Sequence, residues 1–182
     1  MQACEQKGWS IAGIEPNEKA RQLASTKTNF KDYQRTVEDL IESNPESFDV
    51  ITMWHVLEHV PNLADFINKI KSLLKPNGVL VVAVPNFKSW DAKHYNSFWA
   101  AYDVPRHLWH FSRKSMEIIF SEFDMKILEE LPMKFDSYYV SLLSEKYKKG
   151  KQNFFSAFYQ GLRSNQKAGQ SGEYSSLIYL IK

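Results

Sequence analysis

The sequence predicts an open α/β fold, with a mostly parallel sheet and helices on both faces. Apolar, strand-like runs alternate with amphipathic, helix-like segments along the chain. The run Val79–Val84 is apolar at every residue, which is typical of a strand covered on both faces in a parallel sheet. Leu63–Leu74 carries its apolar residues at helical spacing. A length of 182 residues suits one domain.

The first third of the chain predicts two helices and three strands. Glycine ends the first helix, Pro16 suits the first turn of the second, and β-branched residues favour the last strand. In order, these elements are a helix over Met1–Lys7, strand Trp9–Ile14, helix Asn17–Ser25, a weaker strand Tyr33–Val37 and strand Phe48–Met53.

The rest of the chain continues this alternation. Lys75–Gly78 should break the helix Leu63–Leu74, and Ser112 should cap the helix that follows the central aromatic segment. The remaining elements are helix Ser112–Phe123, strand Met125–Leu131, helices Ser137–Tyr147 and Asn153–Arg163, a polar loop Ser164–Glu173 and strand Ser175–Ile181.

The composition is that of an ordinary globular protein. A net charge of +2 is too mild to indicate nucleic acid or a membrane surface as a partner. Cys4 is the single cysteine, which fits a reducing compartment. The N-terminus lacks the apolar core of a signal peptide, and the longest apolar run is far too short to span a membrane. We therefore expect a cytoplasmic protein with no membrane span.

In such a fold, ligands bind beyond the carboxyl ends of the strands. Glu15 follows the first predicted strand and could accept hydrogen bonds from a ribose, or it could be a solvated residue at a helix N-terminus. Glu38 follows the weaker strand and could meet an adenine edge, or lie in a polar turn. An aromatic residue and two histidines follow Phe48–Met53, in the segment Trp54–His59.

Five segments resemble, in order and spacing, class I S-adenosylmethionine-dependent methyltransferases, a Rossmann-like family. The most similar group includes ubiquinone-type O-methyltransferases. The segments are Ile14–Pro16, Phe48–Ile51, Leu57–Pro61, Leu74–Gly78 and Val84–Asn86. Tyr102–Ser112 resembles a bacterial subgroup of this family.

The resemblance implies the cofactor S-adenosyl-L-methionine and its contacts. Glu15, followed by Pro16, would bind the ribose hydroxyls. Val37 and Glu38 would approach the adenine, with Thr36 where aspartate is commoner. The end of the next strand would line the cofactor through Met53, Trp54, His55 and Val56. The family's sheet has an antiparallel last strand inserted beside its neighbour.

One part of the family pattern is absent from this sequence. The first, central strand and its Gly-x-Gly loop would precede the Met1–Gly8 helix, where that loop approaches the methionine carboxylate. A sheet without its middle strand would expose two unpaired edges. We therefore expect 1–182 to be a single methyltransferase domain truncated at its N-terminus.

Methyl transfer to a hydroxyl benefits from a general base, and histidine has a suitable pKa. The candidates are His59, His107 and His110, each of which could instead be structural. Glu58, His59 and His107 also resemble the divalent-metal ligands of RNA 3'-end 2'-O-methyltransferases and some ubiquinone-type enzymes. His55 replaces a further carboxylate, and a set of three nitrogens and one carboxylate favours zinc, manganese or iron over magnesium.

Two segments would cover the acceptor side as lids or insertions, 86–112 and 137–170. The first is rich in aromatic residues, most of which we expect to pack, with Trp99 and Tyr102 favoured as lid residues. The second mixes lysines with aromatic residues. It could cap the acceptor pocket, serve a homodimer or touch RNA, but a solvated helix pair is favoured, and no nucleic-acid partner is expected.

The predicted function is S-adenosylmethionine-dependent methyl transfer to a small-molecule or glycan acceptor, at oxygen. The alternative is a non-catalytic, degenerate methyltransferase-fold protein that serves as a binding or scaffold partner. An NAD-type oxidoreductase is disfavoured because Leu57–Val60 and Leu74–Gly78 do not belong to that family. The sequence does not name the methyl acceptor.

Overall fold

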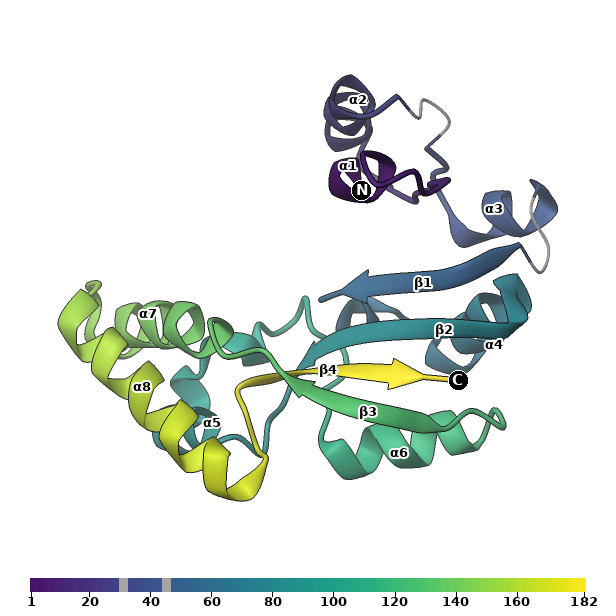
Figure 1. Cartoon of the computed structure of the whole chain (residues 1–182). Coiled ribbons are helices and arrows are strands. Elements are labelled where there is room, and N and C mark those ends of the chain that lie inside the picture. Colours follow the sequence, from purple (N-terminus) through teal and green to yellow (C-terminus); the bar gives the residue numbers. More distant parts are fainter. Residues whose placement is uncertain (30–32, 44–46) are drawn as a thin grey trace.

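The computed structural model describes residues 1–29, 33–43 and 47–182. Within these residues, four strands form one sheet in the order β1-β2-β4-β3 (Figure 1). The strands are β1 (Phe48–Trp54), β2 (Leu74–Pro85), β3 (Ile127–Pro132) and β4 (Ser176–Ile181). β1 pairs parallel to β2, whereas β4 is antiparallel to both β2 and β3. The predicted fold class, with the antiparallel last strand inserted beside its neighbour, is confirmed.

The main core lies on one face of this sheet. Alternate residues of β2, such as Leu80 and Val82, are fully buried because they pack against α4 (Leu63–Leu73) and α6 (Arg113–Ser121). The residue between them, Val81, points to the other face and is only half-buried. The buried face therefore fixes the register of the sheet, since a shift by one residue would reverse it.

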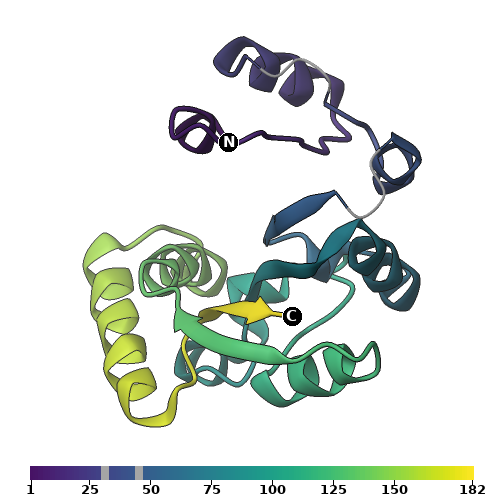
Figure 2. The ribbon, with the colours of Figure 1, turned by 45° about the vertical axis from the view of Figure 1, so that its right-hand side comes forward.

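The N-terminal part differs from the prediction. Figures 1 and 2 show α1 (Gln2–Glu5) and α2 (Glu18–Lys27) beyond the β1 edge of the sheet. The predicted strands Trp9–Ile14 and Tyr33–Val37 are wrong as strands, because their contact is one parallel bridge between Ile14 and Gln34. A single bridge provides no ladder of hydrogen bonds to hold either segment extended.

The second of those segments turns into a helix instead. α3 (Val37–Ser43) begins after Thr36, whose hydroxyl accepts from the backbone N–H of Asp39 at 3.2 Å. The Asp39 carboxylate accepts from the Thr36 N–H at 3.0 Å. This reciprocal cap satisfies free N–H groups at the helix start, which is why the chain becomes helical from Val37.

A second core lies beside the sheet and joins the two predicted insertions. The segment after β2 forms α5 (Trp90–Tyr95) and two 3-10 turns, η2 (Asn96–Phe98) and η3 (Ala100–Tyr102). These elements pack on α7 (Asp136–Lys149) and α8 (Phe154–Ser171). Trp99 is buried in this core and Tyr102 packs against it, so Trp99 serves the packing of the insertion rather than an exposed lid surface.

Two boundaries are corrected as well. The predicted loop Ser164–Glu173 continues α8 as far as Ser171, because Ser164 and Ala168 are buried on one side of the helix. α8 ends at Gly172, whose φ of 78° suits glycine. Lys75–Gly78 does end helix α4, but it forms the start of β2 rather than a separate turn.

None of the helices in the described part of the chain is both long and apolar enough to cross a membrane.

Candidate functional site

The chain turns sharply where β1 ends. His55 has a φ of 53°, and the 3-10 turn η1 (Leu57–His59) follows directly. This turn buries the Glu58 side chain, whose Oε1 lies 3.1 Å from Nδ1 of His55. That hydrogen bond raises the pKa of His55, because the carboxylate stabilises the protonated ring. The other oxygen of Glu58, Oε2, is buried with no hydrogen-bond partner among the described residues.

Two histidines beside Glu58 are oriented by backbone carbonyls. Nδ1 of His59 lies 3.0 Å from the carbonyl oxygen of Arg106, and Nδ1 of His107 lies 2.8 Å from that of Ala101. A carbonyl oxygen can only accept, so each Nδ1 donates and each Nε2 carries the free lone pair. Burial lowers the pKa of His107, which keeps that ring neutral.

Glu58, His59 and His107 therefore form a candidate metal centre. Each offers one ligand atom, and these atoms lie within 4.8 Å of one another. The two rings meet edge to face, with centroids 4.6 Å apart. The backbone brings the segments together, because the Leu108 N–H donates to the Glu58 carbonyl at 2.8 Å. This arrangement unites all three residues predicted as metal ligands.

The cluster fits a divalent cation. A buried carboxylate oxygen with no hydrogen-bond partner costs free energy, and a cation would offset that cost. The carbonyl-oriented histidines have the outer contacts that metal-binding imidazoles typically make. His55 contacts Glu58 through Nδ1 and lies outside the cluster, so the cluster offers two nitrogens and one carboxylate rather than the expected three nitrogens and one carboxylate.

His110 lies apart from this cluster. Its Nε2 is 3.0 Å from the carbonyl oxygen of Tyr102, and its ring meets the Tyr102 ring edge to face. Nε2 therefore donates, which leaves Nδ1 of this exposed ring as the free acceptor.

The predicted cofactor residues at the end of β1 have different environments. Met53 is buried in the main core. Trp54 and Val56 are 51% and 41% exposed, so both present apolar surface on either side of His55. They lie at the carboxyl end of a parallel strand, where an α/β sheet binds its ligands.

The other predicted cofactor residues belong to the N-terminal part. The Glu15 carboxylate accepts from the Asn17 N–H at 2.8 Å, and Pro16 is exposed beside it. The Val37 side chain packs in the main core. Glu38 pairs with Lys69 at 2.6 Å, and this hydrogen bond lowers the pKa of Glu38. Trp54 and Val56 thus present exposed surface in the segment directly before Glu58, whereas Val37 and Glu38 already have protein partners.

Asp136 is a residue that the sequence reasoning missed. It begins α7, accepts a hydrogen bond from the Ser176 hydroxyl, and its negative charge acts on His55. Burial raises the pKa of Asp136. Nothing in the local sequence distinguishes it from an ordinary first-turn acid, because its contacts come from β4 and from the turn after β1.

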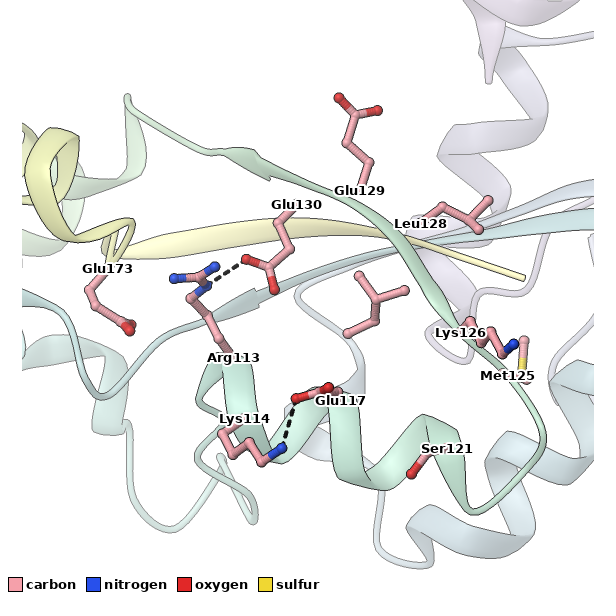
Figure 3. Close-up of a pocket in the computed structure, with 11 residues that line it drawn as sticks. Arg113, Lys114, Glu117, Ser121, Met125, Lys126, Leu128, Glu129, Glu130 and Glu173 are labelled. Atoms are coloured by element: carbon pink, nitrogen blue, oxygen red, sulfur yellow. Dashed lines mark hydrogen bonds and ion pairs between the residues drawn. The ribbon is translucent and has the colours of Figure 1, made fainter.

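A separate open groove lies between α6 and β3 (Figure 3). Two of its basic residues are paired with acids, Arg113 with Glu130 at 2.5 Å and Lys114 with Glu117 at 2.9 Å. β3 is at the opposite edge of the sheet from β1. None of the predicted site residues lines this groove, so we assign it no role.

Comparisons with known proteins agree with this fold. The chain is 39% identical over 100 residues to a ubiquinone biosynthesis O-methyltransferase from Histophilus somni, covering 49% of this chain and 42% of that protein. It is 42% identical over 94 residues to the protein of that name from Haemophilus ducreyi, covering 47% and 40%. The matches thus span about two fifths of the length of these relatives.

A solved structure and a family model extend the similarity. A SAM-dependent methyltransferase from Archaeoglobus fulgidus superposes with a TM-score of 0.60 at 18% identity, covering all of this chain and 79% of that one. The family model described as a methyltransferase domain matches residues 1–130. The chain therefore belongs to the methyltransferase domain family.

Proposed function

We propose that this chain carries the catalytic face of an S-adenosylmethionine-dependent methyltransferase that acts on a hydroxyl oxygen of a small molecule. The observation that carries the proposal is the match of residues 1–130 to the methyltransferase domain family. The relatives' name, O-methyltransferase, supports oxygen as the acceptor atom. Glu58, His59 and His107 support the same choice, because a carboxylate with two imidazoles suits a cation that activates a hydroxyl.

On the donor side, the exposed surface of Trp54 and Val56 offers an apolar seat for the adenosyl group. Glu15 and Pro16 would contact the ribose. Glu15 is half-buried, and its carboxylate is held by one backbone N–H. Met53 and Val37 would support this adenosyl-binding surface from the core. Glu38 could reach an adenine edge only after its ion pair with Lys69 is broken.

On the acceptor side, Glu58, His59 and His107 would hold a divalent cation through Oε2 and the two Nε2 atoms. When bound, the cation would supply Lewis acidity that lowers the pKa of an acceptor hydroxyl. The Arg106 and Ala101 carbonyls keep both rings in the tautomer that can ligate. Of the three histidines predicted as candidate bases, His110 would then be the one not engaged by the cation, and its free Nδ1 would take the hydroxyl proton.

The two insertions, 86–112 and 137–170, would exclude water from the acceptor. They share one core, so they would cover the site as one body rather than as independent loops. Arg106 is a rim residue, since it pairs with Asp103 at 2.5 Å and remains mostly exposed.

The donor half of the proposal is tested by calorimetric titration of the full-length protein with S-adenosylhomocysteine. We expect saturable binding, and then release of this product from S-adenosylmethionine when hydroxylated acceptors are added. Small phenols and free sugars form the two arms of the acceptor panel. Absence of binding at millimolar ligand would reject the enzyme and favour a non-catalytic scaffold.

The metal site is tested separately by Glu58→Gln. Loss of the carboxylate charge should weaken divalent-cation affinity by at least about 10–100-fold, the cost of losing even an outer-shell partner, because it removes one of three ligands. Bound zinc, manganese and iron are measured by mass spectrometry, with circular dichroism as the check on folding. His110→Asn is the matched control and should keep the cation. Equal metal content in both variants and the parent would remove the metal from the proposal.

A further inference from the structure

Helix α8 has its large apolar residues on the outside. Its packed side carries small residues, Ala157, Gly161, Ser164 and Ala168, which are buried. Gly161 lies so close to Tyr138 of α7 that an added Cβ would be 2.6 Å from that ring. The solvent side carries Phe154, Phe155, Phe158, Tyr159 and Leu162, spaced to share one helix face.

The exposure of this aromatic face is large. Phe154 and Phe155 are the first two residues of α8, directly after the loop that joins it to α7. Phe155 is 91% exposed and Phe154 is 67% exposed. Phe158 stacks on Tyr138 with centroids 5.3 Å apart, yet it is still 62% exposed. Contiguous apolar surface of this kind marks an interaction site rather than ordinary surface.

The charge around this face is strongly one-sided. Residues 146–172 contain no acidic residue. They contain six basic residues, which are Lys146, Lys148, Lys149, Lys151, Arg163 and Lys167. The remainder of the chain holds 17 basic and 21 acidic residues. The net charge of +2 is therefore the sum of a basic segment, 146–172, and a remainder with an excess of acidic residues. Among ion pairs of the described residues, Lys149 is paired with Glu145, whereas Lys146 and Lys151 are in none.

The hairpin also stands at the outer edge of the molecule. Figures 1 and 2 show α7 and α8 projecting beside the sheet, with the loop between them at their free end. Residues 146–155, which we name the basic aromatic tip, are exposed throughout. The tip can therefore meet a flat surface without hindrance from the sheet.

We propose that the basic aromatic tip docks on the surface of an anionic lipid bilayer. Phenylalanine rings at the tip would enter the boundary between head groups and acyl chains, while the flanking lysines meet the lipid phosphates. A symmetric contact with a second copy would bring two basic hairpins together, so like charges oppose it. Bases of RNA could stack on tyrosine and phenylalanine, but the adjacent Phe154 and Phe155 at the tip suit hydrocarbon better than they suit a polar strand.

The test is flotation of the full chain with vesicles of phosphatidylcholine alone or mixed with phosphatidylglycerol. We expect at least about tenfold stronger partitioning to the anionic vesicles, because several lysines contribute near such a surface, and weaker binding at high salt. The double variant Phe154→Ser with Phe155→Ser, and the triple variant Lys146→Gln, Lys148→Gln and Lys151→Gln, should each lose about tenfold or more.

Matched controls distinguish binding through the basic aromatic tip from nonspecific adsorption of the protein to vesicles. Leu128→Ser changes an exposed apolar residue on β3, and Lys114→Gln changes an exposed lysine on α6, so both should bind as the parent does. Circular dichroism of every variant establishes that it is folded. Equal binding to neutral and anionic vesicles would overturn the proposal. So would retention of binding by the Phe154/Phe155 variant, tip-dependent binding of single-stranded RNA without vesicle binding, or tip-dependent dimerisation.

Discussion

At the scale of single residues, the candidate site depends on which ring nitrogen is free. His59 and His107 use Nδ1 to contact carbonyl oxygens from a distant segment of the chain. The resemblance to known methyltransferases predicted that these side chains could ligate a metal, and the backbone contacts give them the tautomer that could do so. The turn after β1 places His55 against Glu58, so His55 lies outside the candidate metal cluster. The spacing of these residues along the sequence does not predict that contact.

Asp136 gives a pH dependence that can be measured. Burial raises its pKa above the unfolded value of 3.8. Its contribution to the free energy of unfolding is therefore complete below that value and is lost as pH rises through the folded pKa. In Asp136→Asn the side chain carries no ionisable carboxyl but can still accept a hydrogen bond from the Ser176 hydroxyl. The stability of this variant relative to the parent should therefore be greater at neutral pH than in acid.

Urea unfolding at a series of pH values measures this difference. Asp124→Asn is the control, because Asp124 is exposed and asparagine tolerates its φ of 54°. The stability difference from the parent should change more with pH for Asp136→Asn than for this exposed control. Equal pH profiles of the two variants would contradict the assignment.

At the scale of elements, α7 and α8 form a hairpin through small residues. Gly161→Ala would place a Cβ 2.6 Å from the Tyr138 ring and 3.0 Å from its Cα, so the helices would have to separate. We expect a loss of about 1–3 kcal/mol in the free energy of unfolding, by overpacking. Gly169→Ala is the matched control, since its Cβ meets nothing within 4 Å.

Both substitutions gain helix propensity, worth up to about 1 kcal/mol, so the difference between the two variants isolates the clash. Thermal unfolding followed by circular dichroism measures it. If Gly161→Ala melted as high as Gly169→Ala, the close packing of the hairpin would be wrong.

At the scale of the whole molecule, one buried carboxylate joins the sheet to the second core. Asp91 of α5 accepts from the Trp99 indole at 2.8 Å, from Ser164 of α8 at 2.7 Å and from Ser175, beside β4, at 2.7 Å. All four side chains are buried. This network connects both insertions to the start of the last strand, β4.

Asp91→Ala would leave three buried donors without an acceptor. Each unsatisfied group costs about 1–3 kcal/mol, so we expect a loss of several kcal/mol in urea unfolding. Ser164→Ala removes one donor and leaves the carboxylate with two, so it should cost roughly 1 kcal/mol. Equal losses in the two variants would show that Asp91 does not hold the network together.

The candidate metal ligands Glu58, His59 and His107 came from a family resemblance, whereas the sequence by itself determined the strands β1 and β4 and the helices α4 and α6. These follow from local periodicity and capping, which act within a few residues. The tertiary structure decided the rest. Trp9–Ile14 became no strand because a strand needs a paired neighbour. Helix α8 continued to Ser171 because Ser164 and Ala168 are buried on its packed side. Trp99 is buried and Glu58 lies beside His107 because tertiary packing brings together segments that are far apart in the sequence. Local hydrophobic periodicity does not predict contacts between such segments.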